Sequence, residues 1–369
     1  MIANTCSFLC RCASVFLALW LALIAIMVRG TDLVSASAPP PPAAVPATLV
    51  DPQATAATSK LMGRLAADYG KDTWSGQYYD TNDLAHIRDA SGLKPAIIGG
   101  DFMDYSPSRV AIGGAPSDLT ESMISLSQAG HVITMSWHWN APSGLLNSTN
   151  QPWWRGFYTD ASTFDVAAAL ADTNSVAYGQ ILRDIDAIAV QLKKFSNAGV
   201  PVLWRPLHEA DGGWFWWGAK GPRPFKALWR LLYHRLADDH QLHNLIWVYT
   251  ADKPGWYPGN DVVDIIGVDA YPKEPGDLLL PKWQKLQAQF KGQKLVALTE
   301  FGGVPDVERM QVAGVWWAYF VSWNGTTKSV PDATVARVYR APSVITVDQI
   351  SYHLNAGSSN QPVAAPESK

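Results

Sequence analysis

The sequence predicts an α/β fold, a single (β/α)₈ TIM barrel. Short runs rich in β-branched and aromatic residues alternate with helical patterns along most of the chain, which is typical of βα units on a parallel sheet. Several of these runs are almost wholly apolar, as strands buried on both faces must be. We identify eight of them, at residues 73–78, 95–99, 132–137, 200–206, 245–249, 263–268, 295–299 and 315–321.

The helical pattern is clearest at residues 178–196. Apolar residues such as Ile181 and Ile185 recur there at steps of three and four, which places them on one face of a helix. Asp184 and Asp186 interrupt the apolar series, and we expect both to be surface charges on the solvated side of that helix.

The composition indicates a globular protein with a nearly neutral surface. Hydrophobic residues make up 48% of the chain and charged residues 17%, so disorder over most of the length is excluded. The net charge of -3 argues against a nucleic acid or an anionic membrane as partner. The chain has 17 Trp, 13 Tyr and 11 Phe, and because buried Trp and Tyr need polar partners, we expect some rings to face a ligand.

The N-terminal segment has the layout of a secretory signal peptide. An apolar run at residues 13–28 lies between Arg11 and Arg29, and small residues follow at 35–38. The run is shorter than the roughly 20 residues that span a bilayer. We therefore expect a cleaved signal peptide at 1–38 and a secreted protein, with a retained membrane anchor as the alternative.

The remaining chain divides into three parts. We expect a Pro/Ala-rich linker at 39–59, one barrel domain at 60–356 that carries the catalytic site, and a flexible C-terminal tail at 357–369. All the cysteines precede residue 13, so the barrel domain has neither a disulfide framework nor a Cys-ligated metal.

Two glutamates stand at the ends of predicted strands. Glu209 follows the strand at 200–206 within a ring-rich segment, and Glu300 follows the strand at 295–299. Side chains just past the C-terminal ends of barrel strands face the active-site mouth. Paired carboxyl groups are what glycoside hydrolysis needs, because one protonates the leaving oxygen while the other attacks the anomeric carbon or activates water. Taken singly, either residue could instead be a salt-bridged carboxylate.

These segments resemble glycoside hydrolase family 26, whose typical members are secreted endo-β-1,4-mannanases. The run WRPLHE that ends at Glu209, followed by GGWFWWG at 212–218, is similar to the family's acid/base segment, and LTEFG at 298–302 is similar to its nucleophile segment. The resemblance implies that Glu209 is the general acid/base and Glu300 the nucleophile of a retaining double displacement. Their carboxyl groups should then lie about 5 to 5.5 Å apart.

The resemblance also implies substrate contacts at other strand ends. In SWH at 136–138, His138 would bind the sugar next to the cleaved bond, with a buried core histidine as the alternative. Tyr271 would donate a hydrogen bond to the nucleophile, with Asp269 in support, and Trp323 would form the platform beneath the sugar. The remaining expected contacts are Arg205 and His208, which would fix the two glutamates, and Trp214, which would line the aglycone side.

Other aromatic residues have less certain places. Trp153, Trp154 and Phe157 lie in the long loop after the third predicted strand, where they would add a product-side subsite or pack internally. Trp316 and Trp317 lie on the last predicted strand. Because side chains alternate along a strand, we expect one to face the barrel and the other to face the helices.

A group of histidines, His234, His240 and His243, could suggest a metal site. We interpret it as a solvated helix end and loop, because no acidic or Cys partner has ligand spacing and the group precedes a strand, at the wrong end of the barrel. No phosphate-loop pattern is present either. We therefore expect neither a metal nor another cofactor.

The resemblance implies a monomeric endo-β-1,4-mannanase that acts on mannan, glucomannan or galactomannan. A family member acting on β-1,3-xylan or mixed-linkage β-glucan is the first alternative, since the catalytic segments do not separate these activities. A barrel that binds carbohydrate without cleaving it is the second, and the presence of both glutamates argues against it. Asn324 stands where some family mannanases carry a basic residue, so binding of a more distant sugar should differ.

Overall fold

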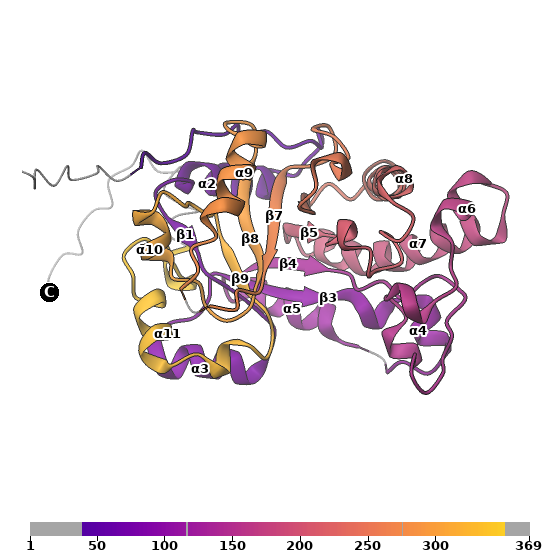
Figure 1. Ribbon diagram of the computed structural model, residues 1–369, viewed down its shortest axis with the longest axis horizontal. Helices are drawn as coiled ribbons and strands as arrows, with labels where there is room; N and C mark the ends of the chain where they lie inside the picture. Colours follow the sequence, from indigo (N-terminus) through magenta and orange to yellow (C-terminus); the bar gives the residue numbers. More distant parts are fainter. Residues whose placement is uncertain (1–38, 116, 275, 351–369) are drawn as a thin grey trace, which may run out of the picture. The chain divides into compact units, whose positions relative to one another are not determined.

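The computed structural model describes residues 39–350 except Pro116 and Pro275, and it contains a closed parallel barrel (Figure 1). The predicted signal peptide at 1–38 and the predicted tail at 357–369 lie outside the described residues. Within the described residues, no helix combines the length and the apolar character needed to cross a bilayer.

Eight strands form the barrel, which confirms the predicted (β/α)₈ fold. They are β2 (Gly76–Tyr78), β3 (Ile97–Asp101), β4 (Val132–Ser136), β5 (Val202–Arg205), β6 (Leu245–Thr250), β7 (Ile265–Ala270), β8 (Leu295–Phe301) and β9 (Phe320–Ser322). Every neighbouring pair is parallel, and the pairing of Gln77 in β2 with Ser322 in β9 closes the ring. Nearly all strand residues are buried, as their apolar sequences predict.

The first and last predicted strands differ from those observed. Residues 73–78 form two strands separated at Ser75, whose hydroxyl donates to the Ile345 carbonyl oxygen at 2.7 Å. Strand β1 (Thr73–Trp74) pairs with β10 (Val344–Ile345) outside the barrel. The final barrel strand begins only at Phe320, so the expectation that Trp316 and Trp317 alternate along it was wrong.

Helices surround the barrel (Figure 1). They are α2 (Ala56–Asp68), α3 (Thr81–Ser91), α4 (Pro107–Ala111), α5 (Leu119–Gln128), α6 (Val166–Ala171), α7 (Val176–Asn197), α8 (Pro222–His234), α9 (Leu280–Phe290), α10 (Val307–Val312) and α11 (Asp332–Tyr339). Helix α2 takes up residues 56–59 of the stretch predicted as linker, and the side chain of Thr55 caps it by accepting from the Thr58 N–H. Trp317 is buried and packs edge-on against Trp283 of α9 at 5.2 Å between ring centroids.

Helix α7 confirms the predicted helix and corrects one of its charges. Asp184 is fully buried, and its carboxylate accepts from Trp139 Nε1 at 2.8 Å and from Arg183 Nε at 2.8 Å. The surface prediction was wrong because Asp184 stands three residues after Ile181, which is the spacing of the apolar face itself. Asp186 is partly exposed and pairs with Arg235 at 2.9 Å.

Candidate active site

A strained turn carries Glu209 to the mouth of the barrel. After β5 ends at Arg205, the backbone at Leu207 (φ 51) and at Glu209 (φ 54) adopts the left-handed conformation. This conformation is unfavourable for residues other than glycine, so the surrounding contacts must impose it. The Glu209 N–H donates to the Thr250 carbonyl oxygen at 3.0 Å, which ties the turn to the end of β6.

Aromatic side chains surround the same turn. The Trp217 indole N–H donates to the His208 carbonyl oxygen at 2.9 Å. Gly218 lies so close to the turn that an added Cβ would lie 1.9 Å from the Ala210 carbonyl oxygen. The glycine and the tryptophans of the predicted acid/base segment thus hold the turn in place.

The Glu209 carboxyl group has the environment of a proton donor. Burial raises its pKa, and the nearby Glu300 carboxylate raises it further. One hydrogen bond reaches it from the Trp214 indole N–H, which donates to Oε2 at 3.0 Å. Trp214 itself is about half exposed, so its ring is accessible beside Glu209.

Glu300 lies near the end of β8, where two donors hold its carboxylate. The Tyr271 hydroxyl donates to Oε1 at 2.6 Å, and Arg205 Nη2 donates to Oε2 at 2.5 Å. Both predicted partners of the nucleophile are therefore in place. Gly302 allows the Tyr271 ring to approach, because a Cβ there would lie 2.6 Å from it. With both oxygens engaged, the group is aimed rather than free to rotate.

Arg205 is the buried cation at the centre of the site. Besides Glu300 it binds Asp269 Oδ2 through Nη1 at 2.6 Å, and its Nε and Nη2 donate to the Tyr78 hydroxyl at 3.1 and 2.9 Å. The Thr299 hydroxyl donates to Asp269 Oδ1 at 2.8 Å. Burial raises the pKa of Asp269, although the adjacent Arg205 opposes this shift. A buried guanidinium with every partner satisfied fixes the geometry of the carboxylates around it.

The two glutamates are close together. Glu209, Asp269 and Glu300 each have one carboxylate oxygen that lies within 4.8 Å of the corresponding oxygens of the other two. Inverting glycosidases need roughly 6.5–9.5 Å between their two carboxyl groups to admit a water, whereas retaining enzymes need about 5–5.5 Å. Three carboxylates could in principle hold a cation, but Arg205 already supplies the positive charge to two of them.

His138 and His208 meet beneath the mouth. His138 Nε2 lies 3.2 Å from His208 Nε2, and His138 Nδ1 lies 2.6 Å from Asp101 Oδ2. Burial alone would lower the pKa of His138, but the Asp101 carboxylate more than offsets this and raises it. Burial, with the charge of Arg205, holds the pKa of His208 well below its usual range. His138 is buried apart from a small exposed fraction of 8%. This burial is compatible both with the predicted contact to a sugar and with the alternative of a core histidine.

Trp323 follows β9 and lies at the same mouth of the barrel as His138. Its ring packs on Tyr78 at 4.7 Å between centroids and lies 5.8 Å from the His138 ring. The Trp323 backbone N–H donates to the Phe301 carbonyl oxygen at 2.8 Å, which ties Trp323 to β8, the strand that carries Glu300. Asn324 beside it is exposed.

The aromatic residues in the loop after β4 differ in their surroundings. Phe157 packs edge-on against the His138 ring at 4.9 Å, so it supports the site from within. Trp154 is half exposed, and the Arg109 guanidinium lies over the Trp153 ring at 5.0 Å. Whether Trp153 or Trp154 contacts a substrate stays a prediction.

The histidines set aside in the sequence each pair with a different aspartate. The pairs are His234 with Asp238 at 2.7 Å, His240 with Asp186 at 2.7 Å and His243 with Asp51 at 2.8 Å. His234 and His240 are partly exposed, in line with the expected helix end and loop, whereas the contact of His243 with Asp51 is largely buried. Sequence patterns did not reveal Asp101 and Tyr78, although both stand at strand ends, which was the signal available.

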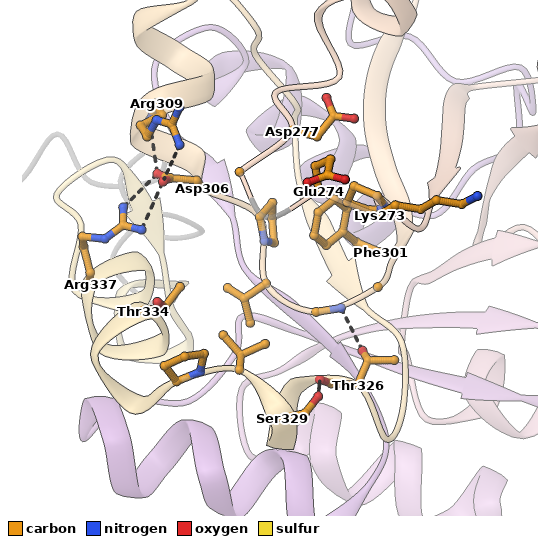
Figure 2. Close-up of a pocket in the computed structure, with 18 residues that line it drawn as sticks. Lys273, Glu274, Asp277, Phe301, Asp306, Arg309, Thr326, Ser329, Thr334 and Arg337 are labelled. Carbon is orange, nitrogen blue, oxygen red and sulfur yellow. Dashed lines mark hydrogen bonds and ion pairs between the residues drawn. The ribbon is translucent and has the colours of Figure 1, made fainter.

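A hollow of about 80 Å³ lies beside the carboxylates, lined among others by Glu209, Trp214 and Asp269. A larger hollow, of about 620 Å³, is bounded by the loops after β7, β8 and β9, and its lining includes Phe301 and Gly302 but not Glu209, Asp269 or Glu300. Figure 2 shows Arg309 and Arg337 converging on Asp306 at one side of this larger hollow. Its rim also holds hydroxyl groups, with Thr326 Oγ1 accepting from the Gly303 N–H at 3.0 Å.

Comparison with known proteins decides the family. The sequence model described as glycosyl hydrolase family 26 matches residues 50–349. The chain belongs to glycosyl hydrolase family 26. This confirms the resemblance that the acid/base and nucleophile segments indicated.

Named relatives and a solved structure are similar to this family 26 chain. A mannan endo-1,4-beta-mannosidase from Thermothelomyces thermophilus is 43% identical over 319 residues, covering 85% of this chain and 65% of the relative. Mannan endo-1,4-beta-mannosidase B from a Piromyces species is 32% identical over 327 residues, covering 84% of this chain and 55% of the relative. The crystal structure of the Podospora anserina GH26-CBM35 β-(1,4)-mannanase has a TM-score of 0.81 and 42% identity, covering 86% of this chain and 72% of that one. This chain thus spans about half to two thirds of the length of these curated relatives.

Proposed function

We propose that this family 26 chain is a retaining endo-β-1,4-mannanase that hydrolyses mannan, glucomannan or galactomannan. The observation that carries the proposal is the unequal environment of two close carboxyl groups. Glu209 is partly buried and has a raised pKa, and Glu300 is held by Tyr271 and Arg205. The names of the similar proteins support β-1,4-mannan as the substrate.

In the first half of the reaction, Glu300 attacks the anomeric carbon of the sugar while Glu209 donates its proton to the departing glycosidic oxygen. The attack forms a covalent bond between Glu300 and the sugar, and the glycosidic bond breaks. The hydrogen bonds from Tyr271 and Arg205 aim the Glu300 carboxylate at this carbon.

In the second half, Glu209 has lost its proton and acts as a base. It takes a proton from a water molecule, the water oxygen bonds to the anomeric carbon, and Glu300 leaves. Two displacements at one carbon return the original configuration. The raised pKa of Glu209 suits both steps, because the group must gain and lose a proton near neutral pH.

We assign the surrounding residues to substrate binding. Trp323 is the platform for the sugar at the cleavage point, since an aromatic face matches the apolar face of a pyranose. Trp214 lines the side of the leaving group, next to Glu209.

The first test is the stereochemical outcome together with the substrate range. Mannan, β-1,3-xylan and mixed-linkage β-glucan are compared as substrates, and ¹H NMR follows the anomer released first from the preferred one. The proposal predicts cleavage of mannan with the β-anomer appearing first. Initial release of the α-anomer would exclude the double displacement. Preferential cleavage of β-1,3-xylan or mixed-linkage β-glucan would contradict the proposal that mannan is the substrate.

We also propose that the protein is secreted after loss of residues 1–38 and acts as a monomer. The signal-peptide layout of the N-terminal segment supports secretion. N-terminal sequencing of protein recovered from the medium of an expressing culture should start near Pro39. Sedimentation should give the mass of a single chain.

A further inference from the structure

A chain of three side chains crosses neighbouring barrel strands below the catalytic pair. Asp101 ends β3, His138 follows β4, and His208 follows β5. These strands are adjacent, and Asp101 pairs in register with Ser136 two residues before His138. The chain leads directly to Glu209, the residue after His208.

Asp101 is the fixed end of this chain. Its Oδ1 accepts from the backbone N–H groups of Met103 at 2.8 Å and of His138 at 3.0 Å, and its Oδ2 accepts from the Ser136 hydroxyl at 2.7 Å. Burial would raise the pKa of Asp101, but His138 and these donors outweigh burial and lower it. An ionised carboxylate only accepts hydrogen bonds, so the 2.6 Å contact requires His138 Nδ1 to carry a proton.

Both ring nitrogens of His138 are therefore occupied within the protein. Nδ1 donates to Asp101, and Nε2 shares one proton with His208 Nε2 at 3.2 Å. These contacts fix the orientation of the His138 ring. The sugar-binding role expected for His138 from the family resemblance stays a prediction.

His208 depends on this contact. Its Nδ1 has no hydrogen-bond partner among the described residues, so the contact with His138 is the hydrogen bond that orients its imidazole, while the rings of Phe215 and Trp217 pack around it. His208 lies between Leu207 and Glu209, the two left-handed residues of the strained turn. A shift of the His208 ring would move the turn that aims Glu209.

We propose that Asp101 is a positioning residue for Glu209, acting through His138 and His208. This inference rests on the proposed function, since it requires Glu209 to be the acid/base. The other charged groups that act on the two imidazoles are Arg205 and Glu300, and Asp101→Asn leaves both unchanged. The replacement keeps the size of the side chain but removes the charge that fixes the His138 tautomer.

The test compares two leaving groups. For kcat/KM, a poor leaving group such as a sugar needs the proton from Glu209, whereas a dinitrophenolate does not. We expect Asp101→Asn to lower kcat/KM on a mannan oligosaccharide about tenfold or more, and on a dinitrophenyl β-mannoside by much less. Asp89→Asn, on the exposed surface of α3, is the matched control and should match wild type on both.

Three results would overturn the proposal. Equal losses on both substrates would indicate a general structural role, a higher KM with unchanged kcat would indicate a substrate contact, and no change would exclude any role. If wild type cleaves no glycan, the proposed function fails instead, and the two failures are thus distinguishable.

A second measurement needs no variant and no activity. In the resting protein with ¹⁵N-labelled histidine, His138 should show a strongly deshielded Nδ1–H proton that is protected from exchange. An exchanging His138 Nδ1 or an Nε2 open to solvent would contradict the chain of contacts. This measurement keeps the proposal testable should Asp101→Asn fail to fold.

Discussion

Glu209 and Glu300 are the same residue type in two different environments. Glu209 has one indole donor and a raised pKa, whereas Glu300 has a phenol and a guanidinium on its two oxygens. Such differences support the proposed assignment of Glu209 as the acid/base and Glu300 as the nucleophile. Residue type alone would not favour either assignment, whereas the contacts do.

At the residue scale, Glu209→Ala should slow substrates with poor leaving groups far more than those with good ones. The reason is that only a poor leaving group needs the proton, an effect worth about 10²–10⁴-fold. Comparing kcat/KM on mannotetraose with that on a dinitrophenyl β-mannoside measures it. Equal loss on both would remove the acid/base assignment.

Tyr271→Phe should lower kcat about 10- to 100-fold, because it removes one hydrogen bond to a charged group, worth about 1.5–3 kcal/mol. The Tyr271 side chain is half exposed, so the melting temperature should change little. Tyr257→Phe is the matched control, since it also removes one hydroxyl bond, to Asn260 Oδ1 at 2.8 Å. Equal kinetics for the Tyr271→Phe variant and wild type would show that the phenol has no part in orienting Glu300.

At the element scale, the turn after β5 depends on a glycine. Gly218→Ala would place a methyl group 1.9 Å from the Ala210 backbone oxygen, so the turn that carries Glu209 must shift. We expect a large loss of kcat/KM and a lower melting temperature. Gly179→Ala in α7 is the matched control, because an added Cβ there has nothing within 4 Å, and alanine should stabilise the helix by about 0.5–1 kcal/mol. A fully active Gly218→Ala variant would contradict the close packing of this turn.

The strands were predictable as elements because buried strands of a parallel barrel are continuous apolar runs. Their ends were less so. Strand β1 pairs with β10 rather than within the barrel, and the contact of Ser75 with Ile345 joins residues 270 positions apart. The burial of Asp184 in α7 was missed for the related reason that its partner Trp139 belongs to another element.

At the scale of the whole molecule, the buried Asp184 gives folding stability a component that depends on pH. Burial raises its pKa from 3.8 to about 6. The folded state therefore binds more protons than the unfolded state between these values, and this component falls as the pH rises through that window. Across the whole window the free energy of unfolding should fall by about 3 kcal/mol, because one pKa unit corresponds to about 1.36 kcal/mol.

Urea unfolding of wild type and Asp184→Asn at several pH values from 3.5 to 7 measures this component. Asparagine does not titrate, so the free energy of unfolding of wild type should decline relative to the variant as the pH rises. Other carboxylates are common to both proteins and cancel in the difference. Parallel stability curves would contradict the raised pKa of Asp184.

The barrel and the family could be predicted from sequence, because each shows as short local patterns, namely apolar strand runs and the segments around Glu209 and Glu300. The catalytic roles of the two glutamates stay predictions. The contacts among site residues could not be predicted from such patterns. His138 meets His208 across 70 residues and Asp101 across 37, and Tyr78 meets Arg205 across 127. These contacts depend on the register of neighbouring strands, which local patterns do not determine.

The most direct test of the account is reducing-sugar release from galactomannan by the chain lacking residues 1–38, beside its Glu300→Ala variant. The account predicts release by the unsubstituted chain and none above background by the variant, with both melting at similar temperatures. Equal release by the two proteins would contradict the assignment of Glu300 as nucleophile. Release by neither would contradict mannan hydrolysis itself.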